Sequence, residues 1–148
     1  MHRFPVIVLV LAALGFLGFG LWLVVDPVGG LAGVDIAGST PAGVIELRAF
    51  YGGLEVGLGL FLLACAARPG WRVPGLWLVV LGNLCIGLAR LYGIASSGVF
   101  TSFFGVALAW EIGFPLLAML SLRTLARATA RTGAQSGGSA IGSSRRFR

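Results

Sequence analysis

The chain of 148 residues contains no lysine, and only 11% of its residues are charged, whereas a soluble domain carries about 25%. Hydrophobic residues make up 57% of the sequence, and the mean hydropathy is +0.97. These values exclude a water-soluble domain and indicate an integral membrane protein made of one compact unit. All eleven basic residues are arginine, which is typical of a GC-rich genome, and we therefore expect a bacterial protein.

Residues that bind metals or carry redox chemistry are also scarce. The single histidine is His2, and the two cysteines, Cys65 and Cys85, lack the Cys-x-x-Cys spacing. Cys65 is expected near one end of its helix and Cys85 deeper, so we expect no disulfide and interpret both as small apolar core residues. No zinc or haem ligand set can be assembled from these residues. We therefore expect no metal site and no cofactor.

What the sequence does have is four long apolar runs, each close to the ~20 residues that a membrane-spanning helix needs. They cover about residues 4–25, 42–67, 73–92 and 103–122. The first run exceeds the ~7–15 apolar residues of a signal peptide, and we expect it to remain as a helix. Thr40 is expected to cap the second helix, with Pro41 at its first position. The sequence predicts an all-α membrane domain over residues 1–122, an integral four-helix bundle.

Arginine placement predicts how these helices are oriented. Arg3 and the turn holding Arg68 and Arg72 fall on the same side as the basic C-terminus, while the other two loops contain Asp26, Asp35 and no arginine. Under the positive-inside rule, both termini lie in the cytoplasm of a multi-pass protein of the bacterial inner membrane. The net charge of +6 follows from this placement, and we expect no nucleic-acid partner.

Residues 123–148 form a basic tail. Arg123, Arg127 and Arg131 recur every four residues, so they share one stripe if the segment is helical. The stripe is interpreted first as a topology anchor, and it could also contact anionic lipid headgroups. From Gly133 the tail is rich in glycine and serine, which predicts disorder.

Five ionisable residues lie inside the apolar runs, at a cost of ~2.5–3.5 kcal/mol each on insertion scales. They are Glu46, Arg48, Glu55, Arg90 and Glu111. Three carboxylates against two guanidinium groups leave a net charge of −1. We expect Arg48 and Arg90 to pair with Glu46 and Glu111, and Glu55, the deepest, to be in its neutral form.

A rise of ~1.5 Å per residue converts these positions into depths. The result is an outer polar layer of Glu46, Arg48, Arg90 and Tyr51, and a deeper layer of Glu55, Glu111 and Asn83. One helical stripe of the second span holds Arg48, Tyr51, Gly52, Glu55 and Gly59, and its glycines leave room for a helix backbone or a ligand. Pro115 is expected to bend the fourth helix beside Glu111, and Trp110 is a candidate for a pocket wall.

The run Glu46-Leu-Arg48-Ala-Phe-Tyr51-Gly-Gly resembles the signature that opens the second helix of a family of small bacterial membrane proteins, domain of unknown function 4345. Gly87-Leu-Ala-Arg90 and Glu111 resemble its patterns in the third and fourth helices, and Glu55 lies outside the signature. The resemblance covers about residues 5–122 and implies a four-helix fold but no activity. The chain is also distantly similar to DoxX-like bundles, some of which are linked to redox systems.

Three functions remain open on the sequence alone. The first is a binding or accessory protein that holds a lipid, quinone or isoprenoid headgroup through Glu46, Arg48, Tyr51, Asn83, Arg90 and Trp110. The second is a cofactor-independent isomerase or cyclase of a sterol-like, isoprenoid or terpenoid substrate, with Glu111 and Glu55 as catalytic residues. The third is a purely structural charge network. Membrane lipids are expected partners, together with an apolar small molecule and either a second copy or another membrane protein.

Overall fold

The computed structural model describes residues 3–36, 38 and 40–144, with side chains described as far as residue 130. All regular elements in this part of the chain are helical, and four helices are long and apolar enough to cross a membrane. The prediction of an all-α fold is therefore confirmed for these residues, and the four apolar helices support a multi-pass membrane protein. The elements are α1 (Arg3–Val25), α2 (Pro27–Leu31), η1 (Ala32–Val34), α3 (Pro41–Leu47), η2 (Arg48–Gly53), α4 (Leu54–Ala67), η3 (Pro69–Trp71), α5 (Arg72–Ser97) and α6 (Ser102–Ser144).

The second span is built from α3, η2 and α4 in direct succession. Thr40 caps it as predicted, since its Oγ1 accepts a hydrogen bond from the Gly43 amide at 3.1 Å, and Pro41 occupies the first turn. The middle part, η2, is a π-helical turn over Arg48–Gly53. A π-helical turn is wider than an α-turn and shifts the phase of the residues that follow, and such turns are frequent at functional sites.

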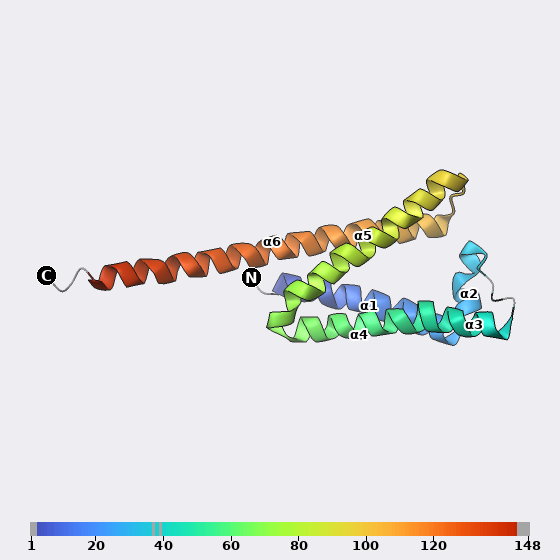
Figure 1. The fold of residues 1–148 in the computed structure, drawn as a ribbon, viewed down its shortest axis with the longest axis horizontal. Helices are drawn as coiled ribbons and strands as arrows, with labels where there is room; N and C mark the ends of the chain where they lie inside the picture. The colour runs from blue at the N-terminus through green and yellow to red at the C-terminus, as the bar shows by residue number, and fades with distance from the viewer. Residues whose placement is uncertain (1–2, 37, 39, 145–148) are drawn as a thin grey trace.

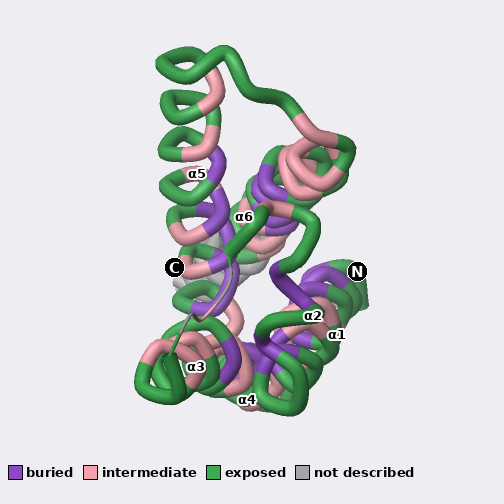
Figure 2. Tube along the Cα trace, turned by 90° about the vertical axis from the view of Figure 1, so that its right-hand side faces the viewer, coloured by how far each residue is buried: buried purple, intermediate pink, exposed green. Residues whose placement is uncertain are grey.

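The four spans are arranged as two pairs. α1 packs along the second span and α5 packs along α6, and the two pairs meet at the end near the start of α1 and the turn η3 (Figure 1). The buried core lies in this region and consists of Val8, Leu9, Ala12, Ala13, Leu62, Cys65, Ala66, Leu76, Val79, Val80 and Ala118. Toward the other end α5 diverges from α1 and α4, and Figure 2 shows its far turns standing apart from them.

Glycines let α1 approach the second span closely. A Cβ added at Gly52 would lie 2.8 Å from the backbone nitrogen of Val24, and one at Gly59 would lie 3.0 Å from the carbonyl oxygen of Ala13. Small residues allow this backbone contact between membrane helices. The space that the sequence predicted beside these glycines is therefore filled by the backbone of α1.

A short covering segment lies across the end of the bundle opposite the core (Figure 1). The sequence predicted a loop here, but the segment folds into α2 and η1. Asp26 stabilises the start of α2, because its Oδ1 accepts a hydrogen bond from the Gly29 amide at 2.9 Å. Leu31 at the end of α2 is buried. This end of the bundle is consequently closed by apolar side chains of α2 and η1.

α6 differs from the sequence-based expectation in its length. It contains the buried Pro115 and runs on to Ser144 through the Gly/Ser-rich segment that was expected to be disordered (Figure 1). Extending an existing helix forms one hydrogen bond for each residue fixed, and nucleation is the costly step. The remainder of the predicted disordered tail, residues 145–148, lies outside the described residues.

The two cysteines are free, as predicted. Cys65 lies in the buried core, also as predicted. Cys85 is instead exposed, because it lies two residues from the buried Asn83 and therefore on roughly the opposite side of α5. In a bilayer this side faces lipid.

Candidate functional site

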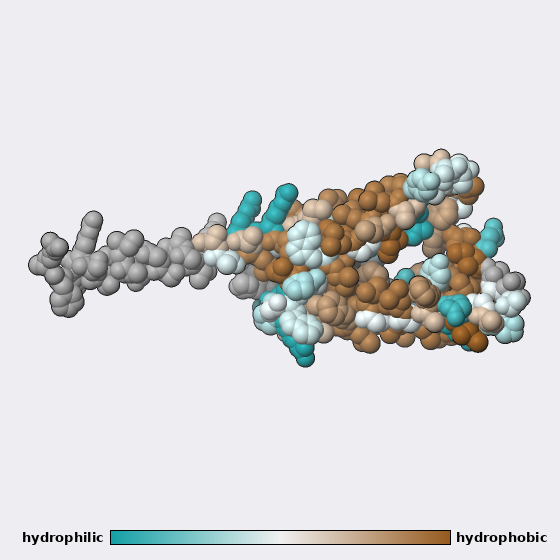
Figure 3. All heavy atoms as spheres, viewed as in Figure 1, coloured by the Kyte–Doolittle hydropathy of each residue, from teal (hydrophilic) through white to brown (hydrophobic). Residues whose placement is uncertain are grey.

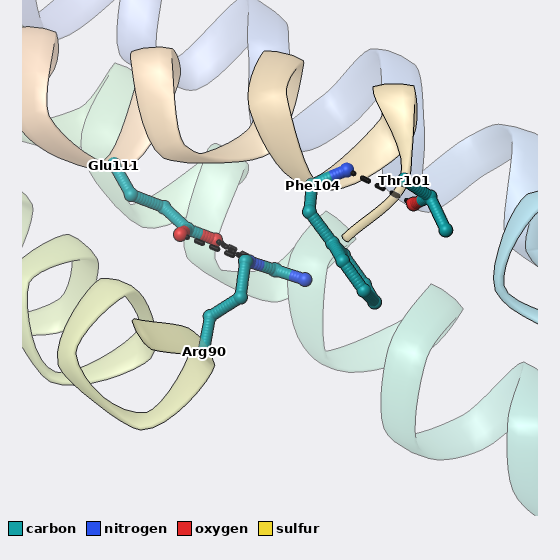
Figure 4. Close-up of polar contacts among 4 residues, drawn as sticks. All are labelled: Arg90, Thr101, Phe104 and Glu111. Atoms are coloured by element: carbon teal, nitrogen blue, oxygen red, sulfur yellow. Dashed lines mark hydrogen bonds and ion pairs between the residues drawn. The ribbon is translucent and has the colours of Figure 1, made fainter. Parts of the chain in front are cut away.

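An ion pair joins α5 and α6 inside the apolar region (Figure 4). The Arg90 Nε donates to both carboxylate oxygens of Glu111 at 3.0 Å, and its Nη2 donates to Oε1 at 2.6 Å. The Glu111 side chain is 6% exposed and that of Arg90 is 23% exposed. The predicted pairing of Arg90 with Glu111 is confirmed. The sequence places the backbones of the two residues at different depths, and the long Arg90 side chain bridges that difference to reach Glu111.

Small and aromatic neighbours define the surroundings of this pair. A Cβ added at Gly87, one turn before Arg90, would lie 3.2 Å from the Cβ of Glu111, so glycine lets α6 come within reach. The Arg90 guanidinium carbon lies 5.9 and 5.7 Å from the ring centroids of Phe103 and Phe104, within cation–π range. Thr101 supports the start of α6, since its Oγ1 accepts a hydrogen bond from the Phe104 amide at 3.4 Å.

A cavity with two chambers lies between the helix pairs. The larger chamber has a volume of about 760 Å³ and the smaller one about 300 Å³, within the range of small-molecule sites. In Figure 3 the surface is hollowed between the two halves of the bundle. The chambers are adjacent, because Glu55 and Arg90 line both, together with Phe16, Phe19, Ile86 and Phe103.

The larger chamber is mostly apolar and lies beneath the covering segment. Leu31, Val34 and Ile36 line it from above, and side chains of all four spans complete its wall. Its polar groups besides Glu55 and Arg90 include Tyr51 and Ser97. The Ser97 hydroxyl already donates to the carbonyl of Gly93 at 2.8 Å. A long apolar chain is the kind of group that such a wall accommodates.

The smaller chamber lies nearer the core and combines aromatic walls with polar groups. Trp110 lines it, stacks on Phe114 at 4.1 Å between ring centroids, and packs directly on Gly15, where an added Cβ would collide with the indole. Asn83 is 2% exposed, and its Nδ2 donates to the Val79 carbonyl at 2.9 Å. The sequence-predicted Trp110 and Asn83 therefore lie at one site with the ion pair.

Glu55 is a carboxyl on the cavity wall that the other described side chains leave free. It projects from α4 and borders both chambers. Among the described residues it has neither a hydrogen-bond partner nor an ion-pair partner. The surplus carboxyl expected from the charge count is thus placed at the junction of the two chambers, where its oxygen atoms are available to a ligand.

Glu46 and Arg48 lie outside this site. Both are exposed, and neither lines either chamber. The Arg48 Nη2 donates instead to the Val25 carbonyl, the last of α1, at 3.4 Å, and the expected ion pair with Glu46 is not formed between these described residues. The π-helical turn begins at Arg48, so the α-helical phase that placed Arg48 and Glu55 on one stripe does not apply.

Sequence reasoning missed the phenylalanines of the wall and the covering segment. Phe16 and Phe19 of α1 and Phe103 of α6 line both chambers. Phenylalanine is common throughout apolar spans, and no spacing distinguished these rings from lipid-facing ones. A weak signal existed at Phe103, which follows the short connection after α5 and is therefore level with Arg90.

The chemistry available at the site is hydrogen bonding and proton transfer within an apolar enclosure. The side chains brought together are Tyr51, Glu55, Asn83, Arg90, Trp110 and Glu111. Within the described residues, no group of three or more histidine, cysteine, aspartate or glutamate side chains could hold a metal ion. The arrangement can hold a polar head beside Arg90 and Glu55 and enclose an apolar chain.

Comparison with known proteins gives the chain a family. No curated protein and no solved structure matches it. One family model, that of Domain of unknown function (DUF4345), matches residues 6–122, which include the four spans' apolar stretches and the described lining of both chambers. The chain therefore belongs to the DUF4345 family of proteins, and the predicted family is confirmed.

Proposed function

We propose that the protein binds an apolar, lipid-like molecule inside the membrane, with the polar end of that molecule at Arg90 and Glu55. The observation that carries this proposal is the two-chambered cavity, whose apolar wall is interrupted by a free carboxyl and a partly exposed guanidinium. Charged groups within membrane spans are costly and mark functional sites. If the charged residues served helix packing alone, we would expect Glu55 to be paired with another side chain. Glu55 instead borders both chambers of the cavity.

The setting of this function is the cytoplasmic membrane of a bacterium, with both termini in the cytoplasm. Arg68 and Arg72 in the turn between α4 and α5 support this orientation through the positive-inside rule. It places the covering segment, with Asp26 and Asp35, on the opposite side. Reporter fusions after residue 70 and within residues 32–36 test the orientation, and only the first should report the cytoplasm.

Binding can be tested by filling the cavity. Gly93 lines the larger chamber, and nothing lies within 4 Å of a Cβ added there, so Gly93→Phe places a ring in the chamber without a backbone clash. Gly57→Phe is the matched control, because its added Cβ is equally free and it lines neither chamber. Native mass spectrometry of protein released from nanodiscs should find a stoichiometric apolar ligand on the wild type and on Gly57→Phe. Absence of any ligand from both would contradict the proposal.

A second function is supported by one specific observation. Glu55 and Glu111 both border the smaller chamber, and a pair of carboxyls in different surroundings is the arrangement that general acid/base chemistry needs. A cofactor-independent isomerase or cyclase acting on a sterol-like, isoprenoid or terpenoid substrate would use them. Glu55→Gln preserves shape and removes acidity. Lipid analysis of cells carrying this variant should show an accumulated apolar substrate if the protein is an enzyme, and unchanged lipids if it only binds.

A further inference from the structure

The charges on the cavity wall constrain what the ligand can be. Arg90 carries one positive charge, and Glu111 cancels it through three short hydrogen bonds. Glu55 adds either no charge or one negative charge, depending on its protonation. In neither state does the wall have a positive charge to spare. An anionic head would place an additional uncompensated charge in a region where unpaired ions are costly.

Hydrogen-bond capacity is nevertheless left over. Nε and Nη2 of Arg90 both bond to Glu111, and because the guanidinium group is planar with a fixed fork, Nη1 points away from that carboxylate. Nη1 has no partner among the described residues. The rings of Phe103 and Phe104 lie beside the guanidinium, and the residue borders both chambers. Nη1 can therefore donate a hydrogen bond to an uncharged acceptor.

We propose that the ligand carries an uncharged carbonyl head that accepts a hydrogen bond from Arg90 Nη1, with its apolar chain in the larger chamber. This inference rests on the binding function proposed above and narrows its ligand class. The placement of the ligand's apolar chain in the larger chamber is supported by the apolar side chains that line it, which include Leu31, Val34 and Ile36. A carboxylate or phosphate head is disfavoured because Glu111 already compensates the charge of Arg90. Arg48 cannot compensate such a head, because it lies outside the cavity.

The test uses three probes that share one chain length: a long-chain methyl ketone, the corresponding fatty acid and the corresponding alkane. The full chain is reconstituted in nanodiscs of phosphatidylcholine, at a pH where the fatty acid is ionised, and saturable binding above bilayer partitioning is measured by native mass spectrometry. We expect the ketone to bind about tenfold more tightly than either other probe. A fatty acid that binds as tightly as the ketone overturns the inference and leaves the binding function intact, whereas no saturable binding of any probe overturns both.

Glu111→Gln is expected to increase the affinity for the fatty acid, and a folding defect would not produce such an increase. The variant releases the positive charge of Arg90, so the affinity for the fatty acid should rise about tenfold and match or exceed that for the ketone. Glu46→Gln removes an exposed carboxyl that lines neither chamber and should leave all three affinities unchanged. An unchanged fatty-acid affinity in Glu111→Gln contradicts the role of Glu111, and the wild-type comparison decides the inference if that variant does not fold.

Discussion

Arg90 on α5 reaches Glu111 on α6 with two of its nitrogen atoms, at distances of 2.6–3.0 Å, and its third nitrogen has no hydrogen-bond partner among the described residues. The pair therefore has two separable effects. It holds two spans together, and it presents a donor whose charge is already compensated. Substitutions that remove the pair as a whole can distinguish these effects.

Removing one partner should be far more damaging than removing both. Glu111→Ala leaves the partly buried Arg90 without its counter-charge, and we expect a loss of up to about 3–5 kcal/mol in the free energy of unfolding. The double variant Arg90→Met/Glu111→Leu replaces the pair by apolar groups and should approach wild-type stability while losing the ligand. Unfolding in mixed micelles and native mass spectrometry measure the two quantities. A double variant that is stable and still holds the ligand would refute the role of the pair in binding.

Gly87 should resist substitution where a neighbouring glycine does not. An added Cβ at Gly87 would meet Glu111 at 3.2 Å, whereas one at Gly82 has nothing within 4 Å. Gly87→Ala should cost about 1–3 kcal/mol through overpacking, and Gly82→Ala should gain about 0.5–1 kcal/mol from its better helix propensity. Equilibrium unfolding of the two variants in the same micelles is the measurement. Equal effects would mean that α5 and α6 are not in close contact at Gly87.

Arg48 should matter little for ligand binding despite its charge. Among the described residues its hydrogen-bond partner is the Val25 carbonyl at the end of α1, so Arg48→Gln should cost no more than about 1 kcal/mol, the size of a charge effect at a helix terminus. Ligand occupancy should match that of the wild type. A variant that folds normally yet loses its ligand would restore Arg48 to the binding site.

Asp26 should control the covering segment. Asp26→Ala removes the cap of α2, for which Asp26 accepts the Gly29 amide, at a local cost of about 0.5–2 kcal/mol. Hydrogen exchange should then accelerate over residues 27–34, and the ligand should dissociate faster. Thr40→Ala removes a similar cap from α3, outside the lining of the cavity, and serves as the control. Faster ligand loss in both variants would point to a general loss of stability.

Much of the fold was predictable because apolar length and arginine placement are strong signals for membrane helices. The sequence predicted the four spans, the Thr40 cap and the contact of Arg90 with Glu111. The π-helical turn at Arg48–Gly53 could not be predicted, because a glycine pair fits many backbone conformations. The consequence was an incorrect placement of Arg48 on the stripe of Glu55.

The site was predictable in its polar residues and in Trp110. Charged residues in apolar spans are rare, so Glu55, Arg90 and Glu111 were conspicuous, and the structure places all three on one cavity. The phenylalanines of the wall were not predictable, since Phe16 and Phe19 resemble any lipid-facing ring. The depth estimate used backbone positions alone, and it therefore did not include the reach of the Arg90 side chain to Glu111.

The two helix pairs meet in a core at one end and separate toward the other. In a bilayer we expect lipid tails to contact the separated ends, while the buried core holds the two pairs together at the other end. The volume between the pairs is then set jointly by the protein and by the lateral pressure of the surrounding bilayer. Ligand affinity should therefore vary with the thickness and packing of the host membrane, even when every residue of the site is unchanged.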